Sequence, residues 1–148
     1  MKPRFSTNER RPEPTFFVDQ NLRGEFVSRL RLAGVRVEEL ESHFPKTALD
    51  IDWLPFVGEK GWVAITKDHL RSDPEEQVAL MVHGVKVFVL LGSKKTHEEF
   101  ATLFLKRFRW ILKTIEKYDE PFMARLSDSG HTITTLADFL NKQARRRR

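Results

Sequence analysis

Two short apolar segments of the chain each run into an aspartate, and this arrangement constrains the fold more than any other feature. The first segment, from Thr15 to Leu22, reads TFFVDQNL, and the second, from Trp62 to Asp68, reads WVAITKD. Open α/β folds place ligands and catalytic groups where a buried strand ends in a strand-to-helix turn. The two segments therefore predict a small α/β domain in which Asp19 and Asp68 lie at functional strand ends.

Predicted strands alternate with predicted helices along most of the chain. Apolar runs predict the strands, and hydrophobic residues at helical spacing, with caps and glycines, predict the helices. The strands are expected at residues 15–18, 35–40, 62–66 and 85–91, and the helices at residues 21–33, 53–59, 74–83 and from 96 through at least 115. This alternation implies βαβ units and a parallel sheet.

The sequence also predicts where the helices begin and which face of the helix from residue 96 is buried. Asn21 is expected to cap the first helix. Asp52 is expected to cap the second, which puts Pro55 in its first turn, where no intrahelical N–H bond is lost. Asp73, Glu75 and Glu76 fit a capping pattern better than a binding site. The expected buried face of the helix from residue 96 consists of Phe100, Phe104, Phe108, Ile111 and Ile115.

The C-terminal part of the chain has a different pattern. Residues 122–126 and 132–135 read as two strands of a hairpin around Ser127 to Gly130, and a final helix from Leu136 runs into four arginines. The proline-rich residues 1–14 show no apolar periodicity, so they are expected to form a flexible arm. The predicted organisation is an arm at 1–14, an α/β domain at 15–118 and a C-terminal extension with a basic tail at 119–148.

Composition excludes several classes of protein. The chain of 148 residues has no cysteine, so disulfides and thiolate metal sites are excluded. It has no apolar run near the 18 residues or so that span a bilayer, and no apolar segment typical of a secretory signal, so a soluble cytoplasmic protein is expected. The net charge of +5 permits nucleic-acid binding without establishing it. Base-rich segments flank an acid-rich one, a pattern that suits a metal site beside a polyanion track and suits solvated surfaces as well.

The aspartates are the strongest candidates for chemistry. The first and third strands are expected to be neighbours where the strand order reverses, which brings Asp19 and Asp68 to one edge, and Asp50 or Asp52 could approach it. Carboxylates and water are ligands that Mg²⁺ and Mn²⁺ prefer. A role for Asp52 as a plain helix cap is equally consistent with the sequence. The chain has no zinc spacing, P-loop, dinucleotide-binding glycine motif or nucleophile elbow.

Three runs of sequence, FFVDQNL, GVRVEELESHFP and LDIDWLPFVGEKGWVAITKDHL, resemble the PIN-like nuclease domains of bacterial toxin–antitoxin systems, the VapC-type toxins. The similarity covers residues 15 to 104. It implies a three-layer α/β/α sandwich with a central parallel sheet and an acidic cluster that binds Mg²⁺ or Mn²⁺. By position, Asp19, Asp50 and Asp68 match the acids of that cluster, and Asp52 falls where a further acid would lie. Glu41 is a weak candidate for the acid that such domains carry in a later helix.

The resemblance implies a metal-dependent endoribonuclease that is the toxin of a toxin–antitoxin pair, with RNA as substrate, an antitoxin as partner and often a dimeric state. Lys67, His69 and Arg71 are candidates for phosphate contacts, with solvated surface as an equal alternative. One rival function is a catalytically degraded PIN-like RNA-binding or scaffold module. The other is a phospho-receiver domain, which needs an acidic pair after the first strand, where this chain has Val18-Asp19.

Overall fold

The computed structural model describes residues 13–22, 24–45, 47–67 and 82–146, of which residues 50, 51, 139, 143 and 146 are described by their backbone alone. The described strands form one six-stranded sheet in the order β2-β1-β3-β4-β5-β6. The strands are β1 (Thr15–Val18), β2 (Arg36–Glu39), β3 (Val63–Lys67), β4 (Lys86–Leu90), β5 (Phe122–Leu126) and β6 (His131–Thr135). All neighbours pair in parallel except β5 and β6, which are antiparallel. The four predicted strands and the predicted hairpin are confirmed.

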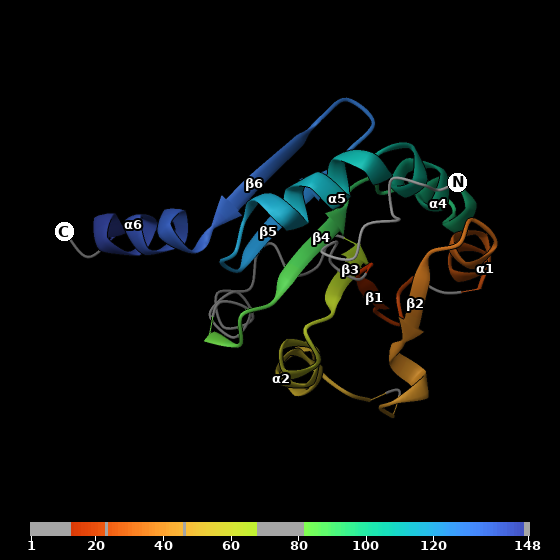
Figure 1. Cartoon of the computed structure of the whole chain (residues 1–148), viewed down its shortest axis with the longest axis horizontal. Helices are drawn as coiled ribbons and strands as arrows, with labels where there is room; N and C mark the ends of the chain where they lie inside the picture. Colours follow the sequence, from red (N-terminus) through yellow and green to blue (C-terminus); the bar gives the residue numbers. More distant parts are fainter. Residues whose placement is uncertain (1–12, 23, 46, 68–81, 147–148) are drawn as a thin grey trace, which may run out of the picture.

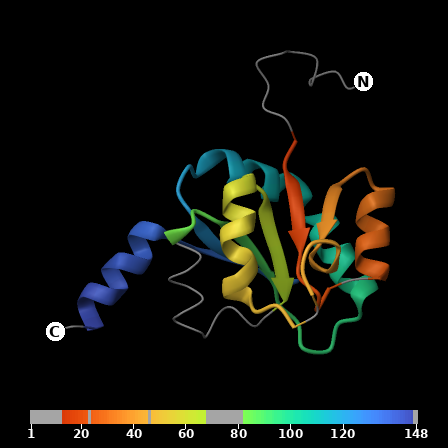
Figure 2. The same ribbon diagram turned by 90° about the horizontal axis from the view of Figure 1, so that it is seen from below.

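Helices cover both faces of the sheet and make it the middle layer of a sandwich (Figures 1 and 2). The described helices are α1 (Glu25–Leu32), α2 (Asp50–Lys60), α4 (His97–Lys106), α5 (Phe108–Lys117) and α6 (Leu136–Arg146), with a short 3₁₀ helix, η2 (Leu40–Ser42). Side chains of α1, α4 and α5 pack on one face of the sheet, and those of α2 pack on the other. The predicted α/β/α sandwich is therefore confirmed.

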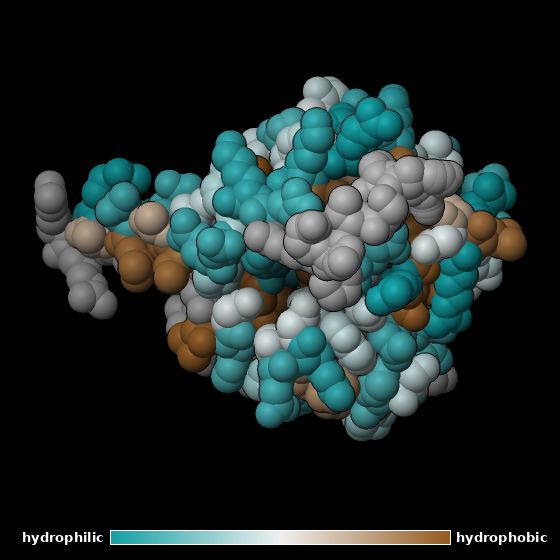
Figure 3. All heavy atoms as spheres, viewed as in Figure 1, coloured by the Kyte–Doolittle hydropathy of each residue, from teal (hydrophilic) through white to brown (hydrophobic). Residues whose placement is uncertain are grey.

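The C-terminal hairpin belongs to the same sheet as the βα units. β5 pairs in parallel with β4 along its full length, and β6 forms the edge of the sheet. α6 follows β6 and projects away from the sandwich, with hydrophobic residues along part of its surface and Leu140 56% exposed (Figure 3). Within the described residues, no helix is both long and apolar enough to cross a bilayer.

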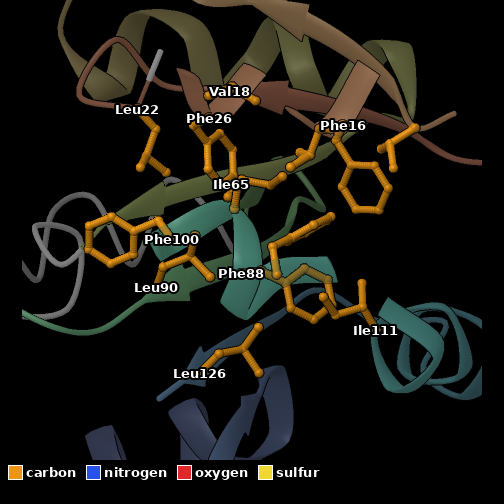
Figure 4. Close-up of a cluster of buried hydrophobic side chains, with 14 of the residues drawn as sticks. Phe16, Val18, Leu22, Phe26, Ile65, Phe88, Leu90, Phe100, Ile111 and Leu126 are labelled. Carbon is orange, nitrogen blue, oxygen red and sulfur yellow. The ribbon is translucent and has the colours of Figure 1, made fainter. Parts of the chain in front are cut away.

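Alternation along the strands produces two hydrophobic cores. On β1, Phe16 and Val18 point to the core beneath α1, α4 and α5, whereas Phe17 points to the core beneath α2. The same alternation holds along β3, β4 and β5, as expected for side chains with a period of two. Figure 4 shows the first core, in which Phe100 of α4 and Ile111 of α5 lie against the sheet residues. Of the predicted buried face, Phe100, Phe104 and Ile111 are buried in this core, and Phe108 and Ile115 are partly buried against it.

The helices predicted at residues 21–33 and from 96 have different limits in the structure, as does the helix predicted at 53–59, which begins at Asp50. The first begins at Glu25 rather than after Asn21, because Gly24 has a positive φ of 61° and Asn21 makes contacts elsewhere. The long helix predicted from residue 96 is two helices, separated at Arg107, whose φ of −99° and ψ of 9° lie outside the helical range. Arg107 donates to the backbone carbonyls of Ser127 and Asp128 at 2.8 and 3.1 Å, which ties the break to the β5–β6 turn. The predicted helix 74–83, with its caps, falls almost wholly outside the described residues.

α4 begins with a capping box formed by Thr96 and Glu99. The Thr96 hydroxyl accepts the Glu99 N–H at 3.0 Å, and the Glu99 carboxylate accepts the Thr96 N–H at 2.8 Å. Replacing Thr96 by alanine leaves an N–H without its acceptor, so we expect the free energy of unfolding to fall by about 1 kcal/mol. Urea denaturation measures this loss. Thr102→Ala in the same helix is the control, and a loss of equal size there would show that the box is not its cause.

Asp128 in the β5–β6 turn forms an ion pair with Lys95, which precedes α4, and Lys95 Nζ lies 2.6 Å from Asp128 Oδ2. The hydrogen bond from Lys95 lowers the pKa of the Asp128 carboxyl below its ordinary value of 3.8. Because the pKa is lowered on folding, the pair stabilises the fold above that ordinary value, and this contribution disappears as the pH falls through the lowered pKa. We expect Lys95→Met to raise the pKa of Asp128 toward 3.8 in a carboxyl NMR titration. An unchanged pKa would contradict this.

Candidate active site

Asp19 lies directly after β1, at the edge where the parallel strands end. Its N–H donates to the Ile65 carbonyl of β3 at 3.1 Å, so the pairing of the two strands continues to the aspartate. The residue is only 4% exposed. One carboxylate oxygen accepts the Gln20 N–H at 2.6 Å, and the other accepts the buried Thr66 hydroxyl at 3.0 Å. These bonds fix the direction of a buried acidic group.

The strand order reverses at this place. β1 pairs with β2 on one side and with β3 on the other, as predicted, and the chain then continues outward through β4 and β5. In open α/β sheets, ligands bind outside the carboxyl ends of the strands at such a reversal. Asp19 is therefore at the position where this architecture places a ligand.

Asn21 joins the loop after β1 to the end of β3. Its side-chain amide donates to the Lys67 carbonyl at 3.3 Å and lies 3.5 Å from the Thr66 hydroxyl. The prediction that Asn21 caps the first helix is wrong, because α1 begins at Glu25 with Gly24 as its N-cap. Thr66 and Asn21 are functional candidates that sequence reasoning missed, although Thr66 directly precedes the Lys67-Asp68 pair that it singled out.

Asp50 and Asp52 both lie in the first turn of α2, which begins three residues earlier than predicted. Asp50 is the first helical residue, whereas it was expected just outside the helix. The Asp52 carboxylate accepts the Leu49 N–H at 2.8 Å. Asp52 is therefore the third residue of the helix and bonds back to the N-cap residue, Leu49, so it is not the N-cap itself. Pro55 consequently lies in the second turn, where it leaves a helical carbonyl without its usual donor.

Asp52 is exposed, and its carboxylate already accepts the hydrogen bond from the Leu49 N–H. Its role as a metal ligand stays a prediction. Asp52→Ala removes the cap, so we expect it to lower the free energy of unfolding by about 1 kcal/mol, measured by urea denaturation. The exposed Glu59 of the same helix provides a matched control, Glu59→Ala. An unchanged stability in Asp52→Ala would contradict the capping role.

The other predicted site residues divide between described and undescribed parts of the chain. Lys67 ends β3, is half-buried, and places its ammonium 5.7 Å from the centre of the Phe100 ring, which is a cation–π geometry. Glu41 lies in η2 directly after β2, at the same edge of the sheet as Asp19. The remaining candidates, Asp68, His69 and Arg71, lie outside the described residues.

The carboxyl-terminal edge of the sheet carries oxygen donors of the kind that suit a hard cation. Asp19 supplies a carboxylate held in place by two hydrogen bonds, and Asp68 follows in sequence the strand that pairs with β1. Among the residues that the structure describes, no three acidic or histidine side chains are close enough to hold a metal ion. Carboxylate oxygens are donors that suit Mg²⁺ or Mn²⁺, and Asp50 and Asp68 stay predicted ligands beside Asp19.

The fold and this edge define an open α/β domain with an acidic group at its ligand-binding position. A family model described as a PIN-like domain matches residues 14–92, which is more than half of the 148 residues. The chain therefore belongs to the PIN-like domain family, whose members are commonly nucleases and generally use divalent metal ions. No curated protein and no solved structure matches the chain.

Proposed function

We propose that the protein is a metal-dependent endoribonuclease whose active site lies at the edge of the sheet around Asp19. The observation that carries this proposal is the buried Asp19 carboxylate, oriented by Gln20 and Thr66 where the strand order reverses. Membership of the PIN-like family supports the same conclusion. Asp19, Asp50 and Asp68 are the proposed ligands of Mg²⁺ or Mn²⁺, with Asp52 as a further acid near the start of α2.

The residues around Asp19 and the basic residues have separate proposed roles in this reaction. The Thr66 and Gln20 hydrogen bonds hold Asp19 in one orientation, so the site needs little rearrangement when it binds its ligands. When bound, a divalent ion supplies a Lewis acid that activates water and neutralises charge on the scissile phosphodiester. Lys67, His69 and Arg71 are the proposed phosphate contacts. Arg145 to Arg148 add salt-dependent affinity for RNA that does not depend on sequence.

The biological role that we propose is that of the toxin in a toxin–antitoxin pair. Its support is the similarity of the FFVDQNL and GWVAITKDHL runs to VapC-type toxins. An antitoxin protein is the partner that this role requires, and a homodimer is the proposed assembly. Growth arrest on expression of the chain, relieved by co-expression of the adjacent reading frame, is the result that this role predicts. Unaffected growth would leave a nuclease without a toxin role.

Cleavage of mixed RNA by the purified protein tests the proposed activity. We expect fragments with Mg²⁺ or Mn²⁺ and none with EDTA, because the carboxylates act through the bound ion. A protein that binds RNA but cuts it under no metal condition would contradict the nuclease proposal. That outcome would favour the second candidate, a PIN-like RNA-binding or scaffold module.

A further inference from the structure

A cavity of about 660 Å³ lies at the opposite edge of the sheet from Asp19. Its lining includes the first residues of β1, β2, β3 and β4, so it opens at the N-terminal edge of the parallel strands. Figure 3 looks onto this side of the molecule, where hydrophilic residues surround small hydrophobic areas. The volume lies in the range of pockets that hold small molecules. The cavity and Asp19 therefore lie at opposite ends of the parallel strands.

Three cations line the cavity and come from three different elements. Arg36 is the first residue of β2, Lys60 is the last of α2, and Lys86 is the first of β4. Lys86 Nζ donates to the Ile115 carbonyl at 2.9 Å, which fixes this ammonium at the wall beside α5. Arg36 and Lys60 are exposed, and the Lys60 ammonium lies 5.6 Å and 5.8 Å from the centres of the Phe56 and Trp62 rings. Such a group of cations is suited to a phosphate.

The rest of the lining is suited to an aromatic body with hydrogen-bond donors. Trp62, Leu112 and Ile115 supply an aromatic and aliphatic wall, and all three are partly buried. Two exposed carboxylates, Glu13 and Glu116, also line the cavity. Carboxylates accept hydrogen bonds from the exocyclic amino groups of nucleobases. A simple inorganic anion would use the cations alone and would meet these carboxylates unfavourably.

We propose that this cavity is a second site that binds a nucleotide with an exocyclic amino group, such as adenosine monophosphate. The cations take the phosphate, the apolar wall takes the base and the glutamates accept its amino group. This pairing accounts for both signs of charge in one cavity, which neither a bare anion nor an apolar ligand does. The proposal is independent of the nuclease function, because it uses no residue of the Asp19 edge.

Calorimetric titration of the full chain in EDTA tests the proposal, with adenosine monophosphate, adenosine and inorganic phosphate as probes. We expect adenosine monophosphate to bind and each of the other two to bind at least about tenfold more weakly. Arg36→Gln and Lys60→Gln should each weaken nucleotide binding by about tenfold. Lys113→Gln on α5, an exposed lysine outside the cavity, is the matched control and should leave binding unchanged.

Three outcomes would overturn the proposal. The first is that adenosine monophosphate does not bind. The second is that inorganic phosphate binds as tightly, since the base would then contribute nothing. The third is that binding is lost in Asp19→Asn and kept in Arg36→Gln, which would assign the nucleotide to the other edge. Because the titration contains no divalent ion and measures no cleavage, its failure leaves the proposed nuclease function unaffected.

Discussion

Replacing Asp19 by asparagine is expected to lower the rate of RNA cleavage by about 10³-fold. The change removes one negative charge from the proposed metal site, where charge stabilisation of the transition state is worth several kcal/mol, and each 1.4 kcal/mol or so is a factor of ten. Asparagine has nearly the same shape, so its carbonyl can still accept the Gln20 N–H, and the Thr66 hydroxyl can rotate to accept from its amide. The fold should therefore be retained while the activity is lost.

The control for this variant is Asp119→Asn, which makes the same chemical change at an exposed position outside the site. Its cleavage rate should equal that of the wild type. Circular dichroism and urea denaturation of both variants separate loss of activity from loss of fold. Cleavage by a folded Asp19→Asn protein at more than a tenth of the wild-type rate would contradict the assignment of Asp19 as a metal ligand.

Replacing Phe16 by alanine should have the largest effect on stability. Phe16 lies on a central strand and is fully buried. Its ring centroid lies 5.3 Å from that of Phe104, which it meets edge-on, and 6.0 Å from that of Phe108, which is tilted against it. Truncation leaves a cavity beneath α4 and α5, so we expect the free energy of unfolding to fall by about 3–5 kcal/mol. This is a large share of the 5–15 kcal/mol or so that stabilises a typical domain.

Urea denaturation measures this loss, with Leu32→Ala as the control. Leu32 is 88% exposed, so its truncation should change the free energy of unfolding by less than about 0.5 kcal/mol. Equal effects of the two substitutions would contradict the placement of Phe16 in the core. Because β1 leads directly into Asp19, a strongly destabilised Phe16→Ala protein should lose cleavage activity at temperatures where the wild type remains active.

The sequence predicts the strands and the layers well because these depend on local patterns. Apolar runs give β1, β3 and β4, and the alternation of Phe16, Phe17 and Val18 between two cores follows from strand geometry. Helix starts are predicted less well. Asn21 is of a residue type that often caps helices, but its side-chain amide donates to the carbonyl of Lys67, 46 residues away. A contact of that kind depends on tertiary structure and leaves no local pattern.

The candidate site shows the same division. Asp19 is identified from sequence because a carboxylate directly after an apolar strand is a local pattern, typical of a functional strand end. Thr66, which orients it, is separated from it by 47 residues and looks like an ordinary strand residue. The cavity at the other edge escapes sequence reasoning, because Arg36, Lys60 and Lys86 are distant in sequence. They line one cavity because Arg36 and Lys86 begin parallel strands at a common edge, and Lys60 ends α2, which leads into β3 at the same edge.

Titration with Mn²⁺, observed by NMR, tests most directly whether the acidic edge of the sheet holds a divalent ion. Bound Mn²⁺ broadens the signals of nearby nuclei, so its position can be read from the affected backbone amides. The account predicts that the amides of Gln20 and Lys67 broaden first, at substoichiometric Mn²⁺, and that this effect disappears in Asp19→Asn. Broadening that is absent, that is centred on another part of the chain, or that persists in Asp19→Asn would contradict it.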